Sequence, residues 1–261
     1  GKSSFFIWRI APFCWYNSFK AKNMTKVSEL SFFFPFWNEE QNLESVVKKA
    51  IPVAEKFAQN WEIIMVDDGS SDKTLEIAQK LAKEDARLIA VAHNSNRGYG
   101  AALKTGFSKA KYELVVFNDG DGQFDLSEID KFLEKIDKVD IVIGFRKKRL
   151  DNPFRHILMN LLKIWDFVFF GFRFKDIDCG FKLFKKSALN KIMPFKSEGA
   201  MITTEILAKA KREHLRISEV EVHHYPRIYG DQSGGNLRVI IRAIRESLIL
   251  WKNLNFNYGR N

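Results

Sequence analysis

Cysteine is scarce in this sequence, and long apolar runs are absent. The two cysteines, Cys14 and Cys179, are too few for a disulfide framework and lack the spacing of a zinc site, which favours a reducing compartment. No stretch reaches about 18 uninterrupted apolar residues, so the sequence does not predict a transmembrane helix. Helix-turn-helix, zinc-module and aromatic RNA-binding signatures are also missing, and we therefore expect no nucleic-acid partner.

Positive charge is in excess. The net charge of the 261 residues is +10, and apolar residues make up 46% of them, which is enough for a large core in a single domain. Between residues 145 and 186, eleven lysines and arginines stand against four acids. A local basic excess of this kind suits phosphorylated substrates or anionic lipid.

Strand and helix patterns alternate through the first half of the chain. The predicted strands are 30–34, 61–66, 88–92, 114–117 and 139–143. The helices predicted between them are 38–57, 71–83 with Ser71 as N-cap, 99–110 and 126–136. This alternation indicates βαβ units and a parallel sheet, in which binding sites lie beyond the carboxyl ends of the strands.

The pattern changes after Gly144. The segment 154–174 is basic and strongly apolar, and the predicted elements beyond it are strands at 181–184 and 215–222 and helices at 203–212 and 236–251. A wide apolar face with flanking cations suits a membrane surface, whereas burial in the core or in a dimer interface is the alternative. Residues 1–23 are expected to be a leader or a non-native extension before Met24, or a short interfacial anchor.

Asp119-Gly120-Asp121-Gly122-Gln123 directly follows the strand 114–117. Alternate residues of an extended segment point the same way, so Asp119, Asp121 and Gln123 can converge on one point. Carboxylate and amide oxygens are ligands that suit Mg²⁺ or Mn²⁺. The stretch therefore predicts a divalent metal site with positions open for a diphosphate, and an Asp/Gly turn that merely ends a strand is the alternative.

Polar clusters follow the other strands as well. Pro35–Glu39 ends the first strand and Asp67–Asp72 the second, where carboxylates can accept hydrogen bonds from a ribose hydroxyl or a base N–H. Pro35 and Phe36 can form an apolar wall against the base, although ordinary turn and cap chemistry is the alternative. Asn96–Ala102 follows the third strand, and its glycines permit either close backbone approach to a ligand or helix packing alone.

In their order along the chain, these clusters resemble glycosyltransferase family 2, which has the GT-A fold. The matching motifs are Pro35-x-x-Asn38-Glu39, Asp67-Asp68-Gly69-Ser70-x-Asp72, Asn96-x-Gly98-x-Gly100 and Asp119-x-Asp121-x-Gln123. The resemblance implies an α/β domain with a Rossmann-like, mostly parallel sheet flanked by helices. It also implies that the metal is held by Asp119, Asp121 and Gln123, and that the nucleotide-sugar is bound by Pro35, Phe36, Asn38, Glu39, Asp67, Asp68, Gly98, Asp119 and Arg227.

Motifs of the second half resemble the polyprenyl-phosphate sugar transferases, including dolichyl-phosphate mannose and glucose synthases. They are Gly144-Phe145-Arg146, Asp176-x-x-Cys179-Gly180-Phe181-Lys182 and Arg227-x-x-Gly230-x-x-Ser233. This resemblance implies that Arg227 contacts the donor diphosphate and Arg146 the lipid phosphate. Arg155 and Ser233 are further candidates for binding the acceptor phosphate. Related proteins often carry a serine one helical turn after the arginine that corresponds to Arg155, whereas this sequence has Met159 there.

The resemblance also implies a domain division and a location. We expect a GT-A domain at 24–233, with a nucleotide-sugar half at about 28–144 and an acceptor half at about 145–233, followed by an amphipathic helix and tail at 234–261. The expected location is the cytoplasmic membrane face, in peripheral association. Related synthases often carry C-terminal membrane helices, so the expectation is peripheral binding, a small membrane-anchor protein as partner, or a shortened sequence.

The leading hypothesis is an inverting, metal-dependent hexosyltransferase that moves a hexose from a UDP- or GDP-sugar to a polyprenyl or dolichyl phosphate. Asp121, through the metal, and Arg227 would stabilise charge on the leaving diphosphate. An ionised lipid phosphate needs only positioning, whereas a hydroxyl acceptor needs a general base, for which Asp176 and Glu205 are the candidates. The alternatives are a family 2 enzyme that glycosylates a saccharide or protein hydroxyl in cell-surface glycan synthesis, and a catalytically silent, membrane-associated nucleotide-binding protein.

Overall fold

The computed structural model describes residues 25–147, 165, 167–171, 173–230 and 237–257. Several expectations fall outside the described residues. They concern the leader with Met24, most of the apolar-basic segment 154–174, and the acceptor-phosphate candidates Arg155 and Ser233.

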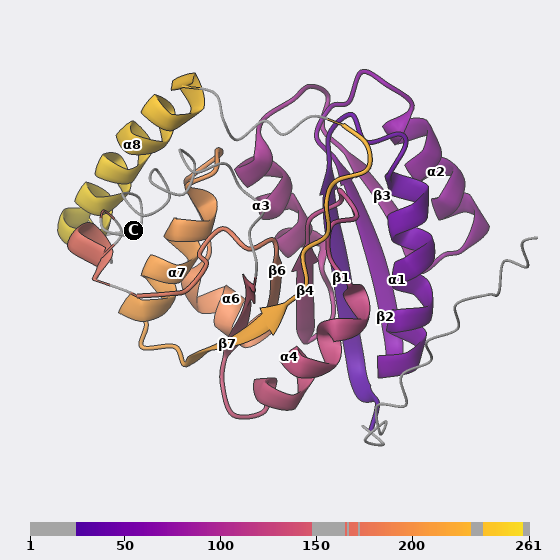
Figure 1. The fold of residues 1–261 in the computed structure, drawn as a ribbon, viewed down its shortest axis with the longest axis horizontal. Coiled ribbons are helices and arrows are strands. Elements are labelled where there is room, and N and C mark those ends of the chain that lie inside the picture. Colours follow the sequence, from indigo (N-terminus) through magenta and orange to yellow (C-terminus); the bar gives the residue numbers. More distant parts are fainter. Residues whose placement is uncertain (1–24, 148–164, 166, 172, 231–236, 258–261) are drawn as a thin grey trace, which may run out of the picture.

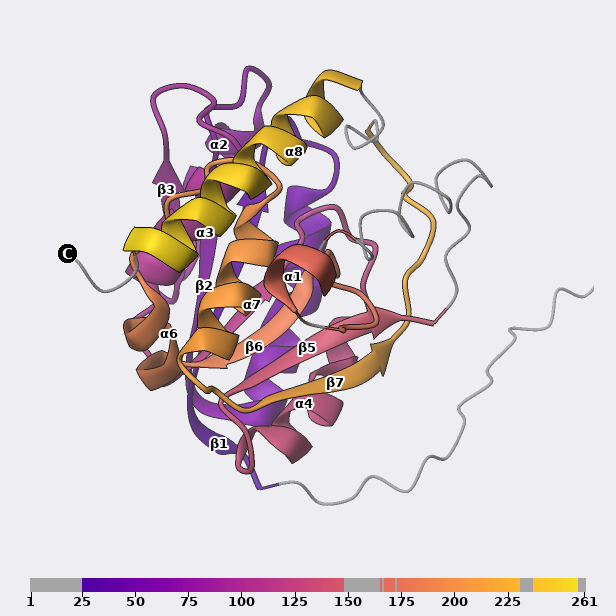
Figure 2. The ribbon, with the colours of Figure 1, turned by 90° about the vertical axis from the view of Figure 1, so that its left-hand side faces the viewer.

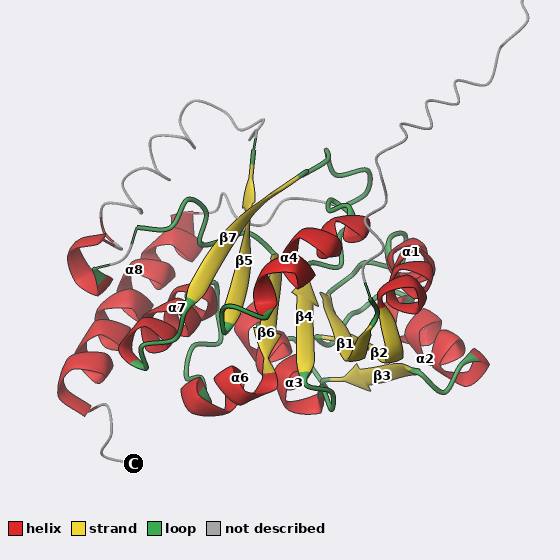
Figure 3. Ribbon diagram, turned by 90° about the horizontal axis from the view of Figure 1, so that it is seen from below, coloured by secondary structure: helices red, strands yellow, loops and turns green. Residues whose placement is uncertain are grey.

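One seven-stranded sheet organises the described part of the chain. Its strand order is β3-β2-β1-β4-β6-β5-β7, which Figure 3 shows from below. The strands are β1 (Val27–Phe36), β2 (Ala58–Asp67), β3 (Leu88–Ala92), β4 (Leu114–Asn118), β5 (Ile141–Arg146), β6 (Phe181–Lys185) and β7 (Ile217–Val222). Neighbouring strands run parallel except at β6, which pairs antiparallel with both β4 and β5. The mostly parallel sheet confirms the predicted fold class.

Helices cover both faces of the sheet (Figure 1 and Figure 2). One face carries α1 (Leu43–Phe57), α2 (Thr74–Glu84), and the short helix η1 (Leu126–Glu128) with α4 (Ile129–Ile136). The other carries α3 (Tyr99–Lys109), α6 (Lys186–Ile192), α7 (Ile202–Arg212), α8 (Leu237–Lys252) and the final turn η3 (Asn253–Asn257). Both faces of the sheet are therefore buried, as expected where helices flank a parallel sheet.

Phenylalanine-rich β1 links the two cores. Alternate residues of a strand face opposite sides, so Phe32, Phe34 and Phe36 pack on the α1 side while Phe33 packs on the α3 side. The Phe33 ring meets the edge of Phe107 in α3 at a centroid distance of 4.8 Å. Gly106 makes this close approach possible, because a β-carbon there would overlap the Phe33 ring.

Gly106→Ala is expected to lower the free energy of unfolding by about 1–3 kcal/mol, because the added methyl overpacks the core against Phe33. Urea denaturation would measure the loss. Ser108→Ala on the exposed face of the same helix is the matched control and should change stability by no more than about 0.5 kcal/mol. Equal stability of both variants would contradict the packing described for this helix.

Several element boundaries differ from the predicted ones. Helix α1 begins at Leu43 rather than at residue 38, because Asn38 adopts a positive φ of 53° and its loop bonds to the loop after β2. Ser71 is not the N-cap of α2: the carboxylate of Asp72 accepts from the Thr74 N–H at 3.0 Å. The seven-residue helix α6 was not predicted, since it is too short to display helical periodicity.

The predicted C-terminal helix is present as α8, and its described side chains pack partly on the protein. Leu250 of α8 and Leu254 of the following η3 are buried in the core that also contains α7, whereas Leu248 and Ile249 of α8 are 43% and 51% exposed. Part of this helix is therefore buried in the core, which was one of the two predicted alternatives, and part of it remains exposed. Within the described residues, every helix is too short or too polar to cross a lipid bilayer.

Candidate functional site

The polar clusters predicted from the sequence lie at the carboxyl ends of β1, β2 and β4, which are adjacent and parallel. The loops after β1 and β2 bond to each other: the Asn38 N–H donates to Ser70 Oγ at 2.9 Å, and the Ser71 N–H donates to Asn38 Oδ1 at 2.8 Å. Asn38 thus ties the two loops together. Pro35 is half-buried, whereas Phe36 is 2% exposed in the core, so Pro35 offers more of the expected apolar wall.

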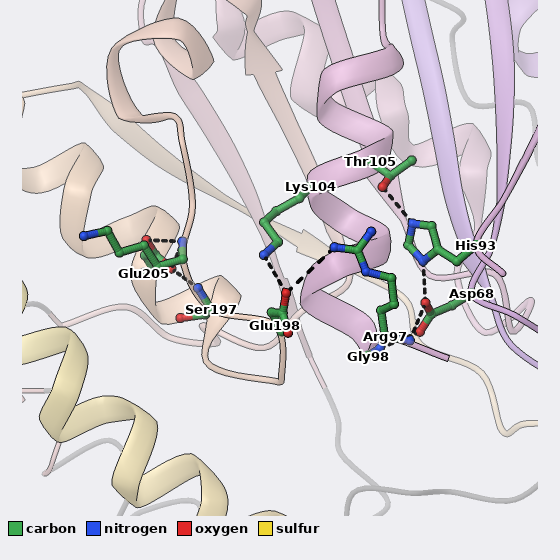
Figure 4. Close-up of polar contacts among 10 residues, drawn as sticks. Asp68, His93, Arg97, Gly98, Lys104, Thr105, Ser197, Glu198 and Glu205 are labelled. Carbon is green, nitrogen blue, oxygen red and sulfur yellow. Dashed lines mark hydrogen bonds and ion pairs between the residues drawn. The ribbon is translucent and has the colours of Figure 1, made fainter. Parts of the chain in front are cut away.

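The neighbouring carboxylates Asp67 and Asp68 have different environments. Asp68 is engaged on both oxygens, by the N–H groups of Arg97 at 3.0 Å and Gly98 at 2.8 Å and by His93 Nδ1 at 2.6 Å (Figure 4). Asp67 accepts from the Ser70 N–H at 3.3 Å with Oδ2, and its buried Oδ1 has no partner among the described residues. An unpaired buried oxygen is costly, so Asp67 keeps unused hydrogen-bonding capacity, whereas Asp68 is committed to the turn at Gly98.

Glu39 and Arg227 form a partly buried ion pair between the two halves of the chain. The segment after β7 runs up to the end of β1 (Figure 1). There the Arg227 guanidinium pairs with the Glu39 carboxylate. Arg227 Nε also donates to the Tyr229 carbonyl at 2.6 Å. Burial raises the pKa of Glu39, Asn42 and Arg227 oppose the rise, and Asp121 adds to it. Glu39, Arg227 and Asp121 therefore share one electrostatic environment.

Asp119 is held on several sides just after β4. Its N–H donates to the Gly180 carbonyl at 2.9 Å, and its Oδ1 accepts from the Tyr99 hydroxyl at 2.8 Å. Gly180 must lack a side chain here, because a β-carbon would overlap the Asp119 carboxylate. Burial, and next the charge of Asp121, raise the pKa of Asp119 to about 6. The repulsion between the two carboxylates makes this a place that favours a bound cation.

The donor chemistry fits Mg²⁺ or Mn²⁺. Asp121 accepts from the Gln123 N–H at 3.0 Å, and Gln123 Nε2 donates to the Tyr225 carbonyl at 2.8 Å, which leaves the amide oxygen as the atom suited to ligation. In the described ranges, no three His, Cys, Asp or Glu side chains cluster as a metal cage. Two carboxylates and an amide instead match a cation that also takes substrate phosphate oxygens as ligands.

Arg146 and Asp176 are paired with each other in the second half. Arg146 Nε and Nη2 donate to the two Asp176 oxygens at 2.6 and 2.8 Å, and both side chains are largely buried. A bidentate partner of this kind fixes the guanidinium plane. The geometry argues against Asp176 as a general base and makes it the group that orients Arg146.

Glu205 lies in the core rather than in the site. It is 0% exposed and accepts from the N–H groups of Lys196 and Ser197 at 2.9 and 2.7 Å and from Lys209 Nζ at 2.9 Å. A fully engaged, buried carboxylate cannot take a proton from a bound hydroxyl. We therefore replace the expected base role of Glu205 by a structural one, as the anchor of the segment 196–198.

Sequence patterns missed several residues of this site. His93 and Tyr99 bond to Asp68 and Asp119, although neither belongs to the acidic clusters that drew attention. Lys182 is 0% exposed and donates to the Cys179 carbonyl, and burial lowers its pKa. The Cys179-Gly180-Phe181-Lys182 motif was the available signal for Lys182, and the Asn96-x-Gly98-x-Gly100 motif flanked Tyr99 without indicating a role for it, whereas no local pattern marked His93.

The curated proteins that resemble this chain include two sugar transferases from different organisms. The chain is 31% identical over 219 residues to dolichyl-phosphate beta-glucosyltransferase of Saccharomyces cerevisiae, across 74% of this chain and 66% of that protein. It is 28% identical over 216 residues to undecaprenyl-phosphate 4-deoxy-4-formamido-L-arabinose transferase of Salmonella choleraesuis, across 82% of this chain and 65% of that protein. The chain thus spans slightly less than two thirds of the length of each relative.

Solved structures with a similar fold include glucosyl-3-phosphoglycerate synthase from Mycobacterium tuberculosis. Its complex with uridine diphosphate has a TM-score of 0.64 at 20% identity, covering 87% of this chain and 79% of that one. Its complex with Mn²⁺ and UDP-glucose has a TM-score of 0.65 at 19% identity, covering 86% and 79%. At this identity the likeness concerns the fold. The model of glycosyl transferase family 2 matches residues 31–193, more than half of the chain, and the protein therefore belongs to this family.

Proposed function

We propose that this protein is an inverting, metal-dependent hexosyltransferase that moves a hexose from a UDP- or GDP-sugar to a polyprenyl or dolichyl phosphate. The observation that carries the proposal is that Asp121 acts electrostatically both on Asp119 and on Glu39 of the Glu39–Arg227 pair, at the sheet edge where the buried Oδ1 of Asp67 has no partner among the described residues. A nucleotide-sugar presents a nucleoside with hydrogen-bond donors and a diphosphate with negative charge. The edge offers an acceptor for the former and cationic groups for the latter.

The donor half of the reaction follows from these groups. Asp67 Oδ1 would accept from the nucleoside, and Arg227 would stabilise the charge that builds on the leaving diphosphate. Asp119, Asp121 and Gln123 would hold Mg²⁺ or Mn²⁺, which supplies Lewis-acid stabilisation of the same charge when bound. Attack on the anomeric carbon from the face opposite the leaving group would invert its configuration.

The acceptor is proposed to be a phosphate because the candidates for a general base are otherwise engaged. Asp176 is paired with Arg146, and Glu205 is buried beside Lys209. A phosphate oxygen is already ionised at neutral pH and needs positioning rather than deprotonation. Arg146, oriented by Asp176, would supply that positioning. The names of both relatives specify a polyprenyl phosphate, which supports the same choice.

A lipid acceptor requires a membrane surface near the site. Tyr225, Ile228 and Tyr229 flank Arg227 and are 49%, 78% and 49% exposed. Exposed apolar side chains beside a cation are suited to the interface of a bilayer. We therefore propose peripheral association with the cytoplasmic membrane face, either directly or through a small membrane-anchor protein.

With Mn²⁺ present, the protein is expected to transfer labelled hexose from a UDP- or GDP-sugar to polyprenyl phosphate, and excess EDTA is expected to abolish transfer until Mn²⁺ is restored. A thermal-shift panel of both nucleotide-sugar types selects the donor first, since a ligand that binds the native state raises the unfolding temperature. A parallel reaction with a saccharide acceptor separates the two enzyme hypotheses.

Each of the other outcomes of this experiment would contradict a specific part of the proposal. Full transfer in EDTA would contradict the metal dependence. Transfer to the saccharide alone would contradict the lipid acceptor. A donor that binds and stays intact with every acceptor would identify a silent nucleotide-binding protein.

A further inference from the structure

Tyr99 contacts the predicted metal ligand Asp119 from a different part of the chain. It is the first residue of α3, and its hydroxyl donates to Asp119 Oδ1 at 2.8 Å. Its ring lies edge-on to that of Phe117 in β4, two residues before Asp119, at a centroid distance of 6.2 Å. The hydroxyl is therefore held at one place relative to the end of β4.

The opposite side of the Asp119 carboxylate lies against backbone. Asp119 donates its N–H to the Gly180 carbonyl at 2.9 Å, and the carboxylate occupies the space where a side chain at position 180 would stand. Backbone on one side and a hydroxyl on the other leave the carboxylate little freedom to rotate. Hydrogen bonds of this kind commonly orient the carboxylates that ligate metals.

Tyr99 lies between two glycines that touch the second half of the chain. The Gly100 N–H donates to the Glu198 carbonyl at 2.8 Å. A β-carbon on Gly98 would stand 2.6 Å from the Glu198 carbonyl oxygen, and one on Gly100 would stand 2.7 Å from that of Ser197. The Glu198 carboxylate also lies 3.5 Å from Lys104 in α3 (Figure 4). The start of α3 is thus seated on the segment 196–198.

That segment is itself anchored in the core. The N–H groups of Lys196 and Ser197 donate to Glu205, a carboxylate that is 0% exposed on α7 (Figure 4). Glu205 thereby fixes the segment that seats Gly100. A continuous set of contacts runs from α7 through this segment to Tyr99 and then to Asp119.

We propose that Tyr99 is a positioning residue for the metal ligand Asp119, and that the segment 196–198 sets the place of Tyr99. The cation site of the nucleotide-sugar half would then be completed by contacts with the acceptor half. This inference rests on the proposed function only in that Asp119 is taken as a ligand of the cation. Without the Tyr99 hydroxyl the Asp119 carboxylate can rotate. Cation binding must then also order this carboxylate, which makes the binding free energy less favourable.

Tyr99→Phe removes one oxygen and keeps the ring against Phe117. The affinity of the substrate-free protein for Mn²⁺ alone, measured from free Mn²⁺ by electron paramagnetic resonance, is expected to fall about tenfold. Tyr112→Phe, a tyrosine at the far end of β4 from Asp119, is the matched control and should keep the wild-type affinity for Mn²⁺. An unchanged Mn²⁺ affinity in Tyr99→Phe would overturn the role of Tyr99.

Gly100→Ala tests the second part of the proposal and leaves Tyr99 itself intact. The added methyl presses on the Ser197 carbonyl and shifts the start of α3, so Mn²⁺ binding is expected to weaken. Both substitutions act on the same hydrogen bond, from Tyr99 to Asp119. The double variant should therefore bind Mn²⁺ as tightly as whichever single variant has the lower Mn²⁺ affinity. Additive losses, or wild-type affinity in Gly100→Ala, would overturn the role of the segment 196–198.

Sugar transfer measured on the same proteins separates this inference from the proposed function. Weaker Mn²⁺ binding by the variants without transfer by the wild type supports the positioning role and contradicts the transferase. Transfer by the wild type with equal Mn²⁺ affinities in all proteins contradicts the positioning role alone. A wild-type protein that binds no Mn²⁺ would overturn both.

Discussion

Asp121→Ala is expected to lower the rate of sugar transfer roughly 100- to 1,000-fold while the protein stays folded. Asp121 is half-buried at the sheet edge, and the hydrogen bond to it comes from the nearby Gln123 N–H at 3.0 Å. Its removal therefore takes away a proposed metal ligand without opening the core. The transfer rate at saturating donor and the urea midpoint are the two measurements.

The charge of Asp121 also affects the pKa values of two neighbouring carboxyl groups. Asp121 raises the pKa of both Asp119 and Glu39, so its removal is expected to lower both pKa values. Protonation of Asp119 therefore cannot account for the lost activity. Asp137→Asn, an exposed carboxylate at the end of α4, is the matched control and should retain full transfer. Transfer by Asp121→Ala within a few-fold of wild type would contradict the assigned role of this carboxylate.

Glu205→Ala is expected to lower the free energy of unfolding by about 3–5 kcal/mol, the cost of removing one partner of a buried ion pair. The substitution leaves the largely buried Lys209 without its carboxylate and the N–H groups of Lys196 and Ser197 without their acceptor. Urea denaturation measures the loss. Glu198→Gln, whose side chain is 48% exposed, is the control and should lie within about 1 kcal/mol of wild type.

The stabilisation by Glu205 should depend on pH in a defined direction. Burial acts to raise its pKa, but the bonds from Ser197, Lys209 and Lys196 outweigh burial, and the pKa lies below the ordinary value of 4.5. A lowered carboxyl pKa contributes stability above the unfolded value and loses it as the pH falls through the folded value. The stability gap between wild type and Glu205→Gln should therefore be full at neutral pH and shrink below about pH 4.5. If the Glu205→Gln variant were as stable as wild type but inactive in sugar transfer, the result would contradict the structural role and support a catalytic role for Glu205.

Local patterns predicted most of the sheet. The predicted strand 88–92 coincides with β3 (Leu88–Ala92), and the predicted strand 114–117 falls one residue short of β4 (Leu114–Asn118). The antiparallel direction of β6 had no counterpart in the sequence, because it depends on how the chain returns between β4 and β5. The predicted boundary at residues 144 and 145 falls inside β5, so both halves share one sheet.

In the site, too, sequence motifs predicted the residues but not the hydrogen bonds of their individual atoms. Motif order indicated Asp67 and Asp68 alike, yet Asp68 is engaged by the backbone of Arg97 and Gly98 while Asp67 retains an unpaired oxygen. Glu205 stood out as a carboxylate on a helix, although nothing near it in the sequence indicated that its partners would be the N–H groups of residues 196 and 197.

Local sequence patterns were enough to predict the family, the mostly parallel sheet and the edge at which Asp119 and Asp121 lie. These features follow from periodicity and motif order, which are properties of neighbouring residues. Which carboxylates are already committed to partners within the protein, as Asp68 and Glu205 are, became known only from the folded structure. Folding also brought Tyr99 to Asp119. Hydrogen bonding and burial depend on groups that folding brings together from distant segments, and a local pattern carries no record of them.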